Sequence, residues 1–301
     1  MKDLRLGFIG LGQMGKHCAS NLLKKQGQLI VSDANPEALT FLVEQGAQAV
    51  SSPAELSSLC DTVFLCLPNG DIVEKVIFGP NGLSESFRKG QIIVDLSTVD
   101  FIQTQEIADK VEAMGVSFMD APISGLDVKA KSGELSIMCG GKEEIFKKML
   151  PCLENMGTSI VYLGKHGMGQ LSKTINNILY NINMAGLAEI LPFAVKMGLE
   201  PEKIAQFVNS GTGRSHASEY FLPRILEGNF SYGFTMESAY KDMQTACIVS
   251  VKEKIPTPVL HAAMTTYQMT LLEGFGKDYK GAMIKTFERL LKVYFRKKKE
   301  S

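Results

Sequence analysis

The first half of the chain alternates short apolar runs with segments of helical periodicity. Residues 62–67 and 91–96 are nearly continuous apolar runs, which are typical of strands buried on both faces of a parallel sheet. We expect strands at residues 4–9, 28–32, 47–50, 62–67, 91–96, 116–120, 136–139 and 160–163, and helices at residues 14–25, 36–45 and 53–59. The alternation predicts an α/β domain with a doubly wound parallel sheet, and it leaves the direction of the later strands open.

After Gly164 the pattern becomes helical. One long period covers residues 169–198, and shorter ones cover residues 201–209, 221–227, 236–252, 258–273 and 279–294. We therefore expect two domains, residues 1–164 and 165–301, the second of them all-helical. No Pro- or Ser-rich linker separates them, so the long helix is expected to start directly from the first domain.

Composition narrows the class of protein. The 301 residues are 45% hydrophobic and 21% charged, which is typical of a soluble globular chain. The net charge is zero, which argues against nucleic acid as a partner, because phosphate binding needs a basic field. We expect no membrane partner either, since no apolar run reaches the length of a membrane span.

Cysteine and histidine spacing bears on redox state and metals. The six cysteines contain no C-x-x-C pair and several lie in apolar runs, which favours buried, reduced thiols in a cytoplasmic protein. The four histidines are far apart and lack any ligand spacing, so we expect no metal site.

A glycine-rich turn follows the first predicted strand. The sequence GLGQMG places Gly10, Gly12 and Gly15 in a G-x-G-x-x-G pattern that opens a helix. Such a turn lets the backbone approach a dinucleotide pyrophosphate at the helix N-terminus. This context predicts a Rossmann-type domain. Asp33 ends the second strand, where a carboxylate binds the ribose 2′-hydroxyl and repels a 2′-phosphate, so NAD is favoured over NADP.

Two further strand ends are expected at the same edge of the sheet. One carries Leu67 and Pro68, and the other runs from Asp95 to Thr98. Ligands in open α/β sheets bind at the carboxyl ends of strands, although each segment is equally consistent with ordinary turn chemistry.

The start of the long helix carries an unusual polar stripe. Lys173 and Asn177 are four residues apart and share one face, and asparagine is a mediocre helix former. A ligand-facing surface and an exposed polar face both remain open from this pattern. The segment Asp120 to Gly125 ends in a Ser124–Gly125 turn whose hydroxyl and N–H groups suit a carboxylate, or which is simply a loop.

Together these segments resemble the β-hydroxyacid dehydrogenase family, which includes 3-hydroxyisobutyrate dehydrogenase and tartronate semialdehyde reductase. The resemblance covers essentially the whole chain, including a C-terminal domain similar to that of the longer 6-phosphogluconate dehydrogenases. It rests on four signatures in order: residues 7–15, 120–125, 167–177 and 241–243.

The resemblance implies a role for each matching residue. Lys173 matches the catalytic lysine, and Ser124, Gly125 and Asn177 match the substrate-binding residues. Lys241 matches the lysine near the nicotinamide, and Phe234 is a weaker match to an aromatic residue near the site. The residues expected at the cofactor are Gly10, Leu11, Gly12, Gln13, Met14, Gly15, Asp33, Leu67, Pro68, Thr98 and Lys241.

Two positions depart from the family pattern. Leu126 and Lys129 stand where the family usually has glycine, which puts substrate specificity in doubt more than activity. Arg214 is either a partner for a second acidic group of the substrate or part of an ordinary surface ion pair.

The function expected from these patterns is NAD-dependent interconversion of a small 3-hydroxy acid and its semialdehyde, with Lys173 as general acid and base. Alternatives are a reductase of short semialdehydes or glyoxylate-type acids (tartronate or succinic semialdehyde), and a non-catalytic NAD-binding module. The partner is then a small carboxylate substrate. The apolar flank of the long helix predicts a homodimer or homotetramer.

Overall fold

The computed structural model describes residues 4–231 and 234–297, without the side chain of Leu126. The chain forms two compact units, Met1–Lys173 and Thr174–Ser301. The division lies within a helix, nine residues beyond the position 164 expected from the sequence, because the first turns of that helix pack with the strand-containing unit.

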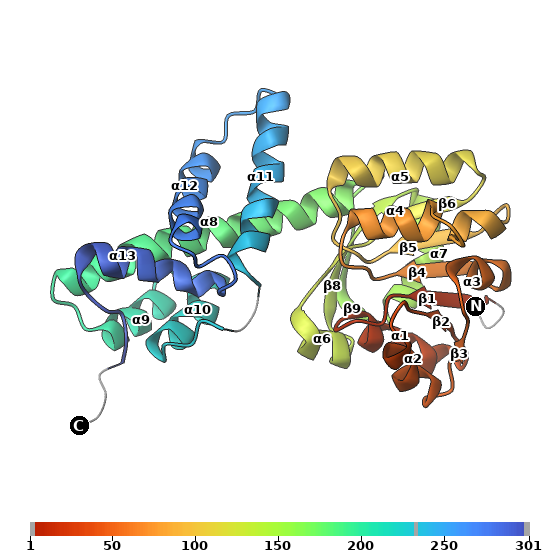
Figure 1. Cartoon of the computed structure of the whole chain (residues 1–301), viewed down its shortest axis with the longest axis horizontal. Coiled ribbons are helices and arrows are strands. Elements are labelled where there is room, and N and C mark those ends of the chain that lie inside the picture. Colours follow the sequence, from red (N-terminus) through yellow and green to blue (C-terminus); the bar gives the residue numbers. More distant parts are fainter. Residues whose placement is uncertain (1–3, 232–233, 298–301) are drawn as a thin grey trace. The chain divides into compact units, whose positions relative to one another are not determined.

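In the described part of the first unit, nine strands form one sheet (Figure 1). They are β1 Leu6–Ile9, β2 Ile30–Ser32, β3 Gln48–Ala49, β4 Thr62–Leu65, β5 Ile92–Asp95, β6 Ser117–Asp120, β7 Ile123–Ser124, β8 Leu135–Gly141 and β9 Gly157–Tyr162. The order is β3-β2-β1-β4-β5-β6-β8-β7, with β9 paired to β8. The first six strands are parallel in the 3-2-1-4-5-6 order of a Rossmann fold, whereas β8 pairs antiparallel with β6 and β7.

Helices cover both faces of this sheet. They are α1 Gly15–Gln26, α2 Pro36–Val43, α3 Pro53–Leu59, α4 Gly70–Phe78, α5 Phe101–Ala113, α6 Leu126–Ser132 and α7 Glu143–Leu153, with a 3-10 turn η1 Leu83–Ser86. Apolar residues of α1, α2 and α7 form one core cluster with the strands, and residues of α3, α4 and α5 form the other. The parallel strands are thus buried on both sides, as their continuous apolar runs predict.

The described residues of the second unit form helices joined by turns, with one isolated β-bridge between Thr235 and Tyr279. Its helices are the main part of α8 Met168–Lys196, then α9 Pro201–Ser210, α10 His216–Leu226, α11 Met236–Lys252, α12 Pro258–Leu272 and α13 Ile284–Leu291, with a 3-10 turn η2 Lys280–Met283. Phe221 and Tyr267 are fully buried at its centre. A single helix was expected over residues 279–294, but the chain forms η2 and the shorter α13, which ends at Lys292 in the left-handed region (φ 55°).

Helix α8 is both long and apolar, a combination found in membrane spans and in core helices. By length and composition alone it could cross a membrane, although no uninterrupted apolar run of that length is present in the sequence. Polar residues such as Lys173 and Asn177 interrupt the run without making the helix polar on average. A core helix passes the same test, and Met184, Ala188 and Leu191 of α8 are buried in the core of the second unit.

Candidate functional site

The glycine turn between β1 and α1 has the conformation that its sequence requires. Gly10 has φ +95°, and a Cβ there would overlap the carbonyl oxygen of Cys66. A Cβ on Gly15 would overlap the carbonyl oxygen of Gly10. Gly12, in contrast, is exposed and faces open space. Gly10 and Gly15 are therefore needed to close the turn, whereas Gly12 leaves open space beside it.

This turn fits the pyrophosphate of a dinucleotide. No side chain caps the N-terminus of α1, so no side-chain acceptor occupies that helix end. The N–H groups of Lys16 and His17 donate to the carbonyl oxygens of Gly12 and Met14. The partial positive charge of the helix end favours an anion there. Gly12 and Gln13 are exposed beside that helix end.

Asp33 accepts two backbone hydrogen bonds and so has a structural role. Its Oδ2 accepts a hydrogen bond from the Leu11 N–H (2.6 Å), and its Oδ1 accepts one from the Asn35 N–H (2.7 Å). The carboxylate thus joins the end of β2 to the glycine turn. Each carboxylate oxygen has a second lone pair, so Asp33 retains acceptor capacity for a ribose hydroxyl.

The loops after β4 and β5 are joined by a side chain. The Leu67 N–H donates to Oγ of Ser97 (2.9 Å). Thr98 is exposed, whereas its neighbours Ser97 and Val99 are buried. Because β1, β2, β4 and β5 are parallel, their carboxyl ends lie at one edge of the sheet, and the expected cofactor residues of the first unit are gathered there.

Lys173 lies beside the predicted substrate segment. Its Nζ donates a hydrogen bond to the carbonyl oxygen of Ile123 (3.0 Å), the residue that precedes Ser124. Ser124 ends the short strand β7, paired with Ser136 of β8, rather than lying in a loop. Gly125 follows with φ +145°, a conformation that favours glycine. The structure therefore brings Lys173 into contact with Ile123, fifty residues earlier in the chain and next to the Ser124–Gly125 segment.

Two buried carboxylates on paired strands near this segment, Asp120 and Asp95, have structural roles that the sequence did not predict. Asp120 accepts hydrogen bonds from the N–H groups of Gly167 (2.8 Å) and Gln170 (3.1 Å), so it binds the N-terminus of α8. Burial raises the pKa of the Asp120 carboxyl above its usual value. Asp95 accepts from the Ser97 N–H (2.9 Å), and burial raises its pKa to about 6, with a contribution from nearby Asp120. In the sequence, the signal that could have indicated these two carboxylates was their position at the ends of predicted strands.

The remaining predicted residues belong to the second unit. Asn177, one turn after Lys173 on α8, donates from Nδ2 to Oδ2 of Asp242 (3.0 Å) on α11. Lys241, beside Asp242, is exposed. Phe234 is 46% exposed, and its ring centroid lies 5.3 Å from Nζ of Lys280.

Lys129, one of the two positions outside the family pattern, and Arg214 are both exposed. Lys129 is exposed on α6, and the side chain of Leu126 lies outside the described part of the chain. Arg214 forms an exposed ion pair with Glu219 (3.6 Å), which agrees with the ordinary surface interpretation.

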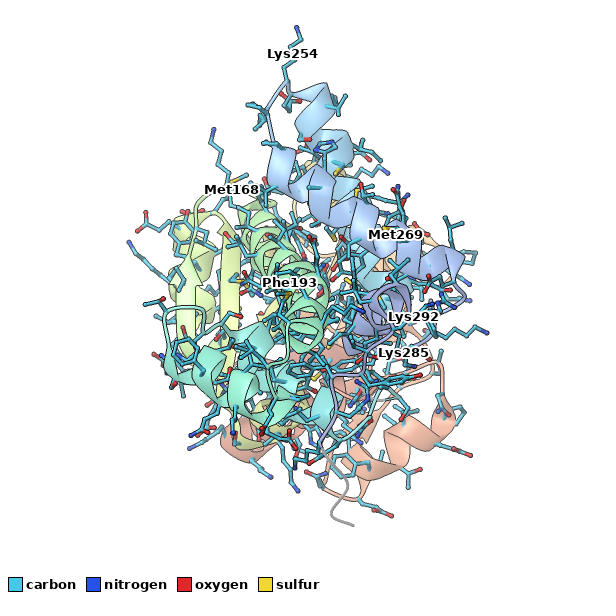
Figure 2. The ribbon with its side chains drawn as sticks, turned by 90° about the vertical axis from the view of Figure 1, so that its left-hand side faces the viewer. Met168, Phe193, Lys254, Met269, Lys285 and Lys292 are labelled. Carbon is cyan, nitrogen blue, oxygen red and sulfur yellow. The ribbon has the colours of Figure 1, made fainter. Side chains whose placement is uncertain are left out.

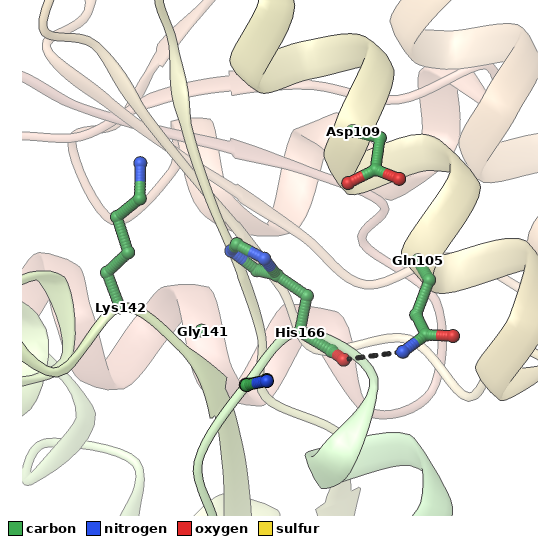
Figure 3. Close-up of a pocket in the computed structure, with 6 residues that line it drawn as sticks. Gln105, Asp109, Gly141, Lys142 and His166 are labelled. Carbon is green, nitrogen blue, oxygen red and sulfur yellow. Dashed lines mark hydrogen bonds between the residues drawn. The ribbon is translucent and has the colours of Figure 1, made fainter.

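A separate cavity of about 510 Å³ lies in the first unit (Figure 3). It is lined by Gln105, Asp109, Gly141, Lys142, Lys165 and His166. None of the predicted cofactor or substrate residues lines it, so it is distinct from the glycine turn and from Lys173. Among the described residues, no group of three or more His, Cys, Asp or Glu side chains is placed to hold a metal ion.

Known proteins share both halves of this architecture. The NAD binding domain of 6-phosphogluconate dehydrogenase matches residues 5–164, and the NAD-binding domain of NADP-dependent 3-hydroxyisobutyrate dehydrogenase matches residues 167–287. 2-(Hydroxymethyl)glutarate dehydrogenase of Eubacterium barkeri is 36% identical over 97% of each chain. 2-Hydroxy-3-oxopropionate reductase of Escherichia coli is 36% identical over 81% of this chain and 83% of its own.

A solved structure has the same fold as this chain. Mycobacterium tuberculosis 3-hydroxyisobutyrate dehydrogenase with L-serine superimposes with a TM-score of 0.84 at 25% identity, over 94% of this chain and 98% of that one. The fold and these relatives define an oxidoreductase that uses a nicotinamide cofactor. The chain belongs to the β-hydroxyacid dehydrogenase family and is a hydroxy acid dehydrogenase or semialdehyde reductase. The alternative of a non-catalytic module is thereby set aside.

Proposed function

We propose that this protein interconverts a small 3-hydroxy acid and its semialdehyde with NAD, and that Lys173 is the general acid and base. The observation that carries the proposal is the hydrogen bond from Lys173 Nζ to the Ile123 carbonyl (3.0 Å). This bond holds a lysine ammonium beside the Ser124–Gly125 segment, to which we assign the substrate carboxylate. Asn177 is assigned to orienting the substrate oxygen, and Lys241 to the nicotinamide side of the cofactor.

In reduction, Lys173 donates a proton to the carbonyl oxygen as it becomes an alkoxide. In oxidation, Lys173 as the amine accepts the hydroxyl proton. The nicotinamide, when bound, accepts hydride in oxidation and supplies it in reduction. The Ser124 hydroxyl and the N–H groups around Gly125 bind the acid group, which sets the distance from the reacting carbon to Lys173.

A substrate panel tests the proposal. NAD⁺ reduction is measured with 3-hydroxyisobutyrate and other 3-hydroxy acids, and NADH oxidation with the matching semialdehydes. We expect turnover with at least one 3-hydroxy acid that exceeds turnover with 2-hydroxy acids of equal size. Activity confined to tartronate semialdehyde, succinic semialdehyde or glyoxylate favours the second candidate, a short-semialdehyde reductase, which the match to 2-hydroxy-3-oxopropionate reductase supports.

The preference for NAD over NADP rests on Asp33. Its carboxylate repels a 2′-phosphate, and residues 34–37 contain no arginine that could bind one. We expect kcat/KM to be at least about tenfold higher with NAD⁺ than with NADP⁺, a difference of about 1.4 kcal/mol. Asp33→Ser is expected to lower the ratio of kcat/KM with NAD⁺ to kcat/KM with NADP⁺. Equal or greater wild-type efficiency with NADP⁺ contradicts this assignment.

We also propose that the chain forms a homodimer or a homotetramer. Helix α8 carries exposed apolar side chains along its length, among them Phe193, which is labelled in Figure 2. The Phe193 side chain is 54% exposed. The others are Ile175, Leu179 and Ile190. Such a surface is usually covered by a partner. Light scattering over a hundredfold concentration range is expected to give at least twice the chain mass of 32.9 kDa. A constant monomer mass refutes the proposal.

We propose the cytoplasm as the compartment. All six cysteines are free thiols; five of them are buried and Cys66 is partly buried. Free thiols support a reducing environment.

A further inference from the structure

The inference concerns Gln170, in the first turn of α8, and it rests on the proposed role of Lys173. Gln170 is fully buried, although it lies only three residues before Lys173 on the same helix. Residues three apart are neighbours on a helix surface, so a displacement of one moves the other. The contacts of Gln170 therefore bear directly on where the Lys173 ammonium lies.

The side chain of Gln170 is hydrogen-bonded to the residues before and after Thr98. Its Nε2 donates to the carbonyl oxygen of Ser97 (2.7 Å), and its Oε1 accepts from the N–H of Val99 (3.1 Å). Thr98 lies between these two bonded positions and is exposed. The buried side-chain amide of Gln170 thus links the first turn of α8 to the loop around Thr98, which we assign to the cofactor.

Other contacts hold the same helix end to other parts of the first unit. The Asp120 carboxylate binds the N–H groups of Gly167 and Gln170, which fixes the end of the helix at one point. The contact of Lys173 with Ile123 is made by the end of a flexible side chain. Neither contact reaches the Thr98 loop. Among the side-chain hydrogen bonds of α8 in the described part of the chain, those of Gln170 join it to that loop.

We propose that Gln170 is a positioning residue that holds Lys173 in register with the cofactor loop at Thr98. Its amide acts through geometry and takes no part in proton transfer. Loss of the two hydrogen bonds lets the first turn of α8 shift about Asp120, which moves the ammonium away from the reacting oxygen while both binding segments stay intact. A displacement of about 1 Å of a catalytic group costs roughly a hundredfold in rate.

Gln170→Met tests the proposal, because methionine keeps the length and volume but makes neither hydrogen bond. We expect kcat to fall by roughly 10- to 100-fold, while the Kd for NADH, set by the glycine turn, stays within about threefold. The primary deuterium isotope effect on kcat, measured with the hydroxy acid deuterated at the carbinol carbon, is expected to rise as hydride transfer becomes limiting.

Gln91→Met is the matched control. Gln91 is a buried glutamine at the opposite end of β5, and its Nε2 donates to the carbonyl oxygens of Ser57 and Cys60 (both 2.9 Å). It is expected to lose a similar amount of thermal stability but to keep the wild-type kcat and isotope effect. If the two variants lose kcat equally, or if Gln170→Met keeps the wild-type kcat and isotope effect, Gln170 is only a structural residue.

A second variant and one further measurement keep the outcomes distinct. Should Gln170→Met fail to fold, Gln170→Glu keeps the acceptor for Val99 but, when ionised, cannot donate to Ser97, and the same fall in kcat is expected. Lys173→Ala is assayed in parallel. If Lys173→Ala remains active, the proposed function fails; if it is inactive while the Gln170 variants match wild type, only the positioning role fails.

Discussion

Replacing Lys173 by alanine is expected to lower kcat by about 10²- to 10⁴-fold, the range that a well-placed general acid or base contributes. The variant loses the group that protonates the alkoxide, and with it the hydrogen bond to Ile123. The glycine turn and Asp33 are unchanged, so NADH should bind with nearly the wild-type Kd. Steady-state kinetics on the best substrate and NADH fluorescence titration measure the two quantities separately.

A control lysine is present on the same helix. Lys196 lies in the last turn of α8 and is exposed, so Lys196→Ala should leave kcat and NADH binding unchanged. The assignment of Lys173 is wrong if Lys173→Ala keeps more than about a tenth of the wild-type rate, since that loss is below the range for acid–base catalysis.

The second large effect is expected at the glycine turn, where neighbouring glycines should fail in different ways. Gly12→Ala adds a methyl group in open space, so the free energy of unfolding should change by less than about 0.5 kcal/mol. The same methyl group stands where the backbone must approach the pyrophosphate. We expect the Kd for NADH to rise about tenfold or more, equivalent to 1.4 kcal/mol or more.

Gly10→Ala provides the contrast. Its backbone has φ +95°, and the new Cβ meets the Cys66 carbonyl, so the folded state itself should lose about 2–4 kcal/mol. Chemical denaturation measures this loss. If Gly12→Ala binds NADH like the wild type, the turn does not hold the pyrophosphate, whatever Gly10→Ala does to stability.

Much of the fold follows from local pattern. The helices over Pro53–Leu59 and Met236–Lys252 have the bounds that their periodicity and flanking residues predict. Ser52 caps the first of them by accepting from the Glu55 N–H, with Pro53 at its first position, and Thr235 caps the second. Such signals are contained within a few neighbouring residues.

Elements that depend on distant partners were harder to predict. The pair Ile123–Ser124 is too short to read as a strand, and it becomes one because it pairs with Ile137 and Ser136 of β8. Helix α6 then starts immediately after Gly125. The turn residues of this segment by themselves predict a loop in place of both elements.

The sequence by itself determined the doubly wound sheet, the helical second half, the glycine turn and the spacing of Lys173 and Asn177. Each of these depends on periodicity or on a short motif, which neighbouring residues specify. Only the tertiary structure decided that Lys173 contacts Ile123, that Asp120 binds the start of α8, and that Gln170 is hydrogen-bonded to the residues before and after Thr98. Those hydrogen bonds join segments 47 to 73 residues apart, and their pairing depends on how strands and helix pack together, which no local pattern encodes.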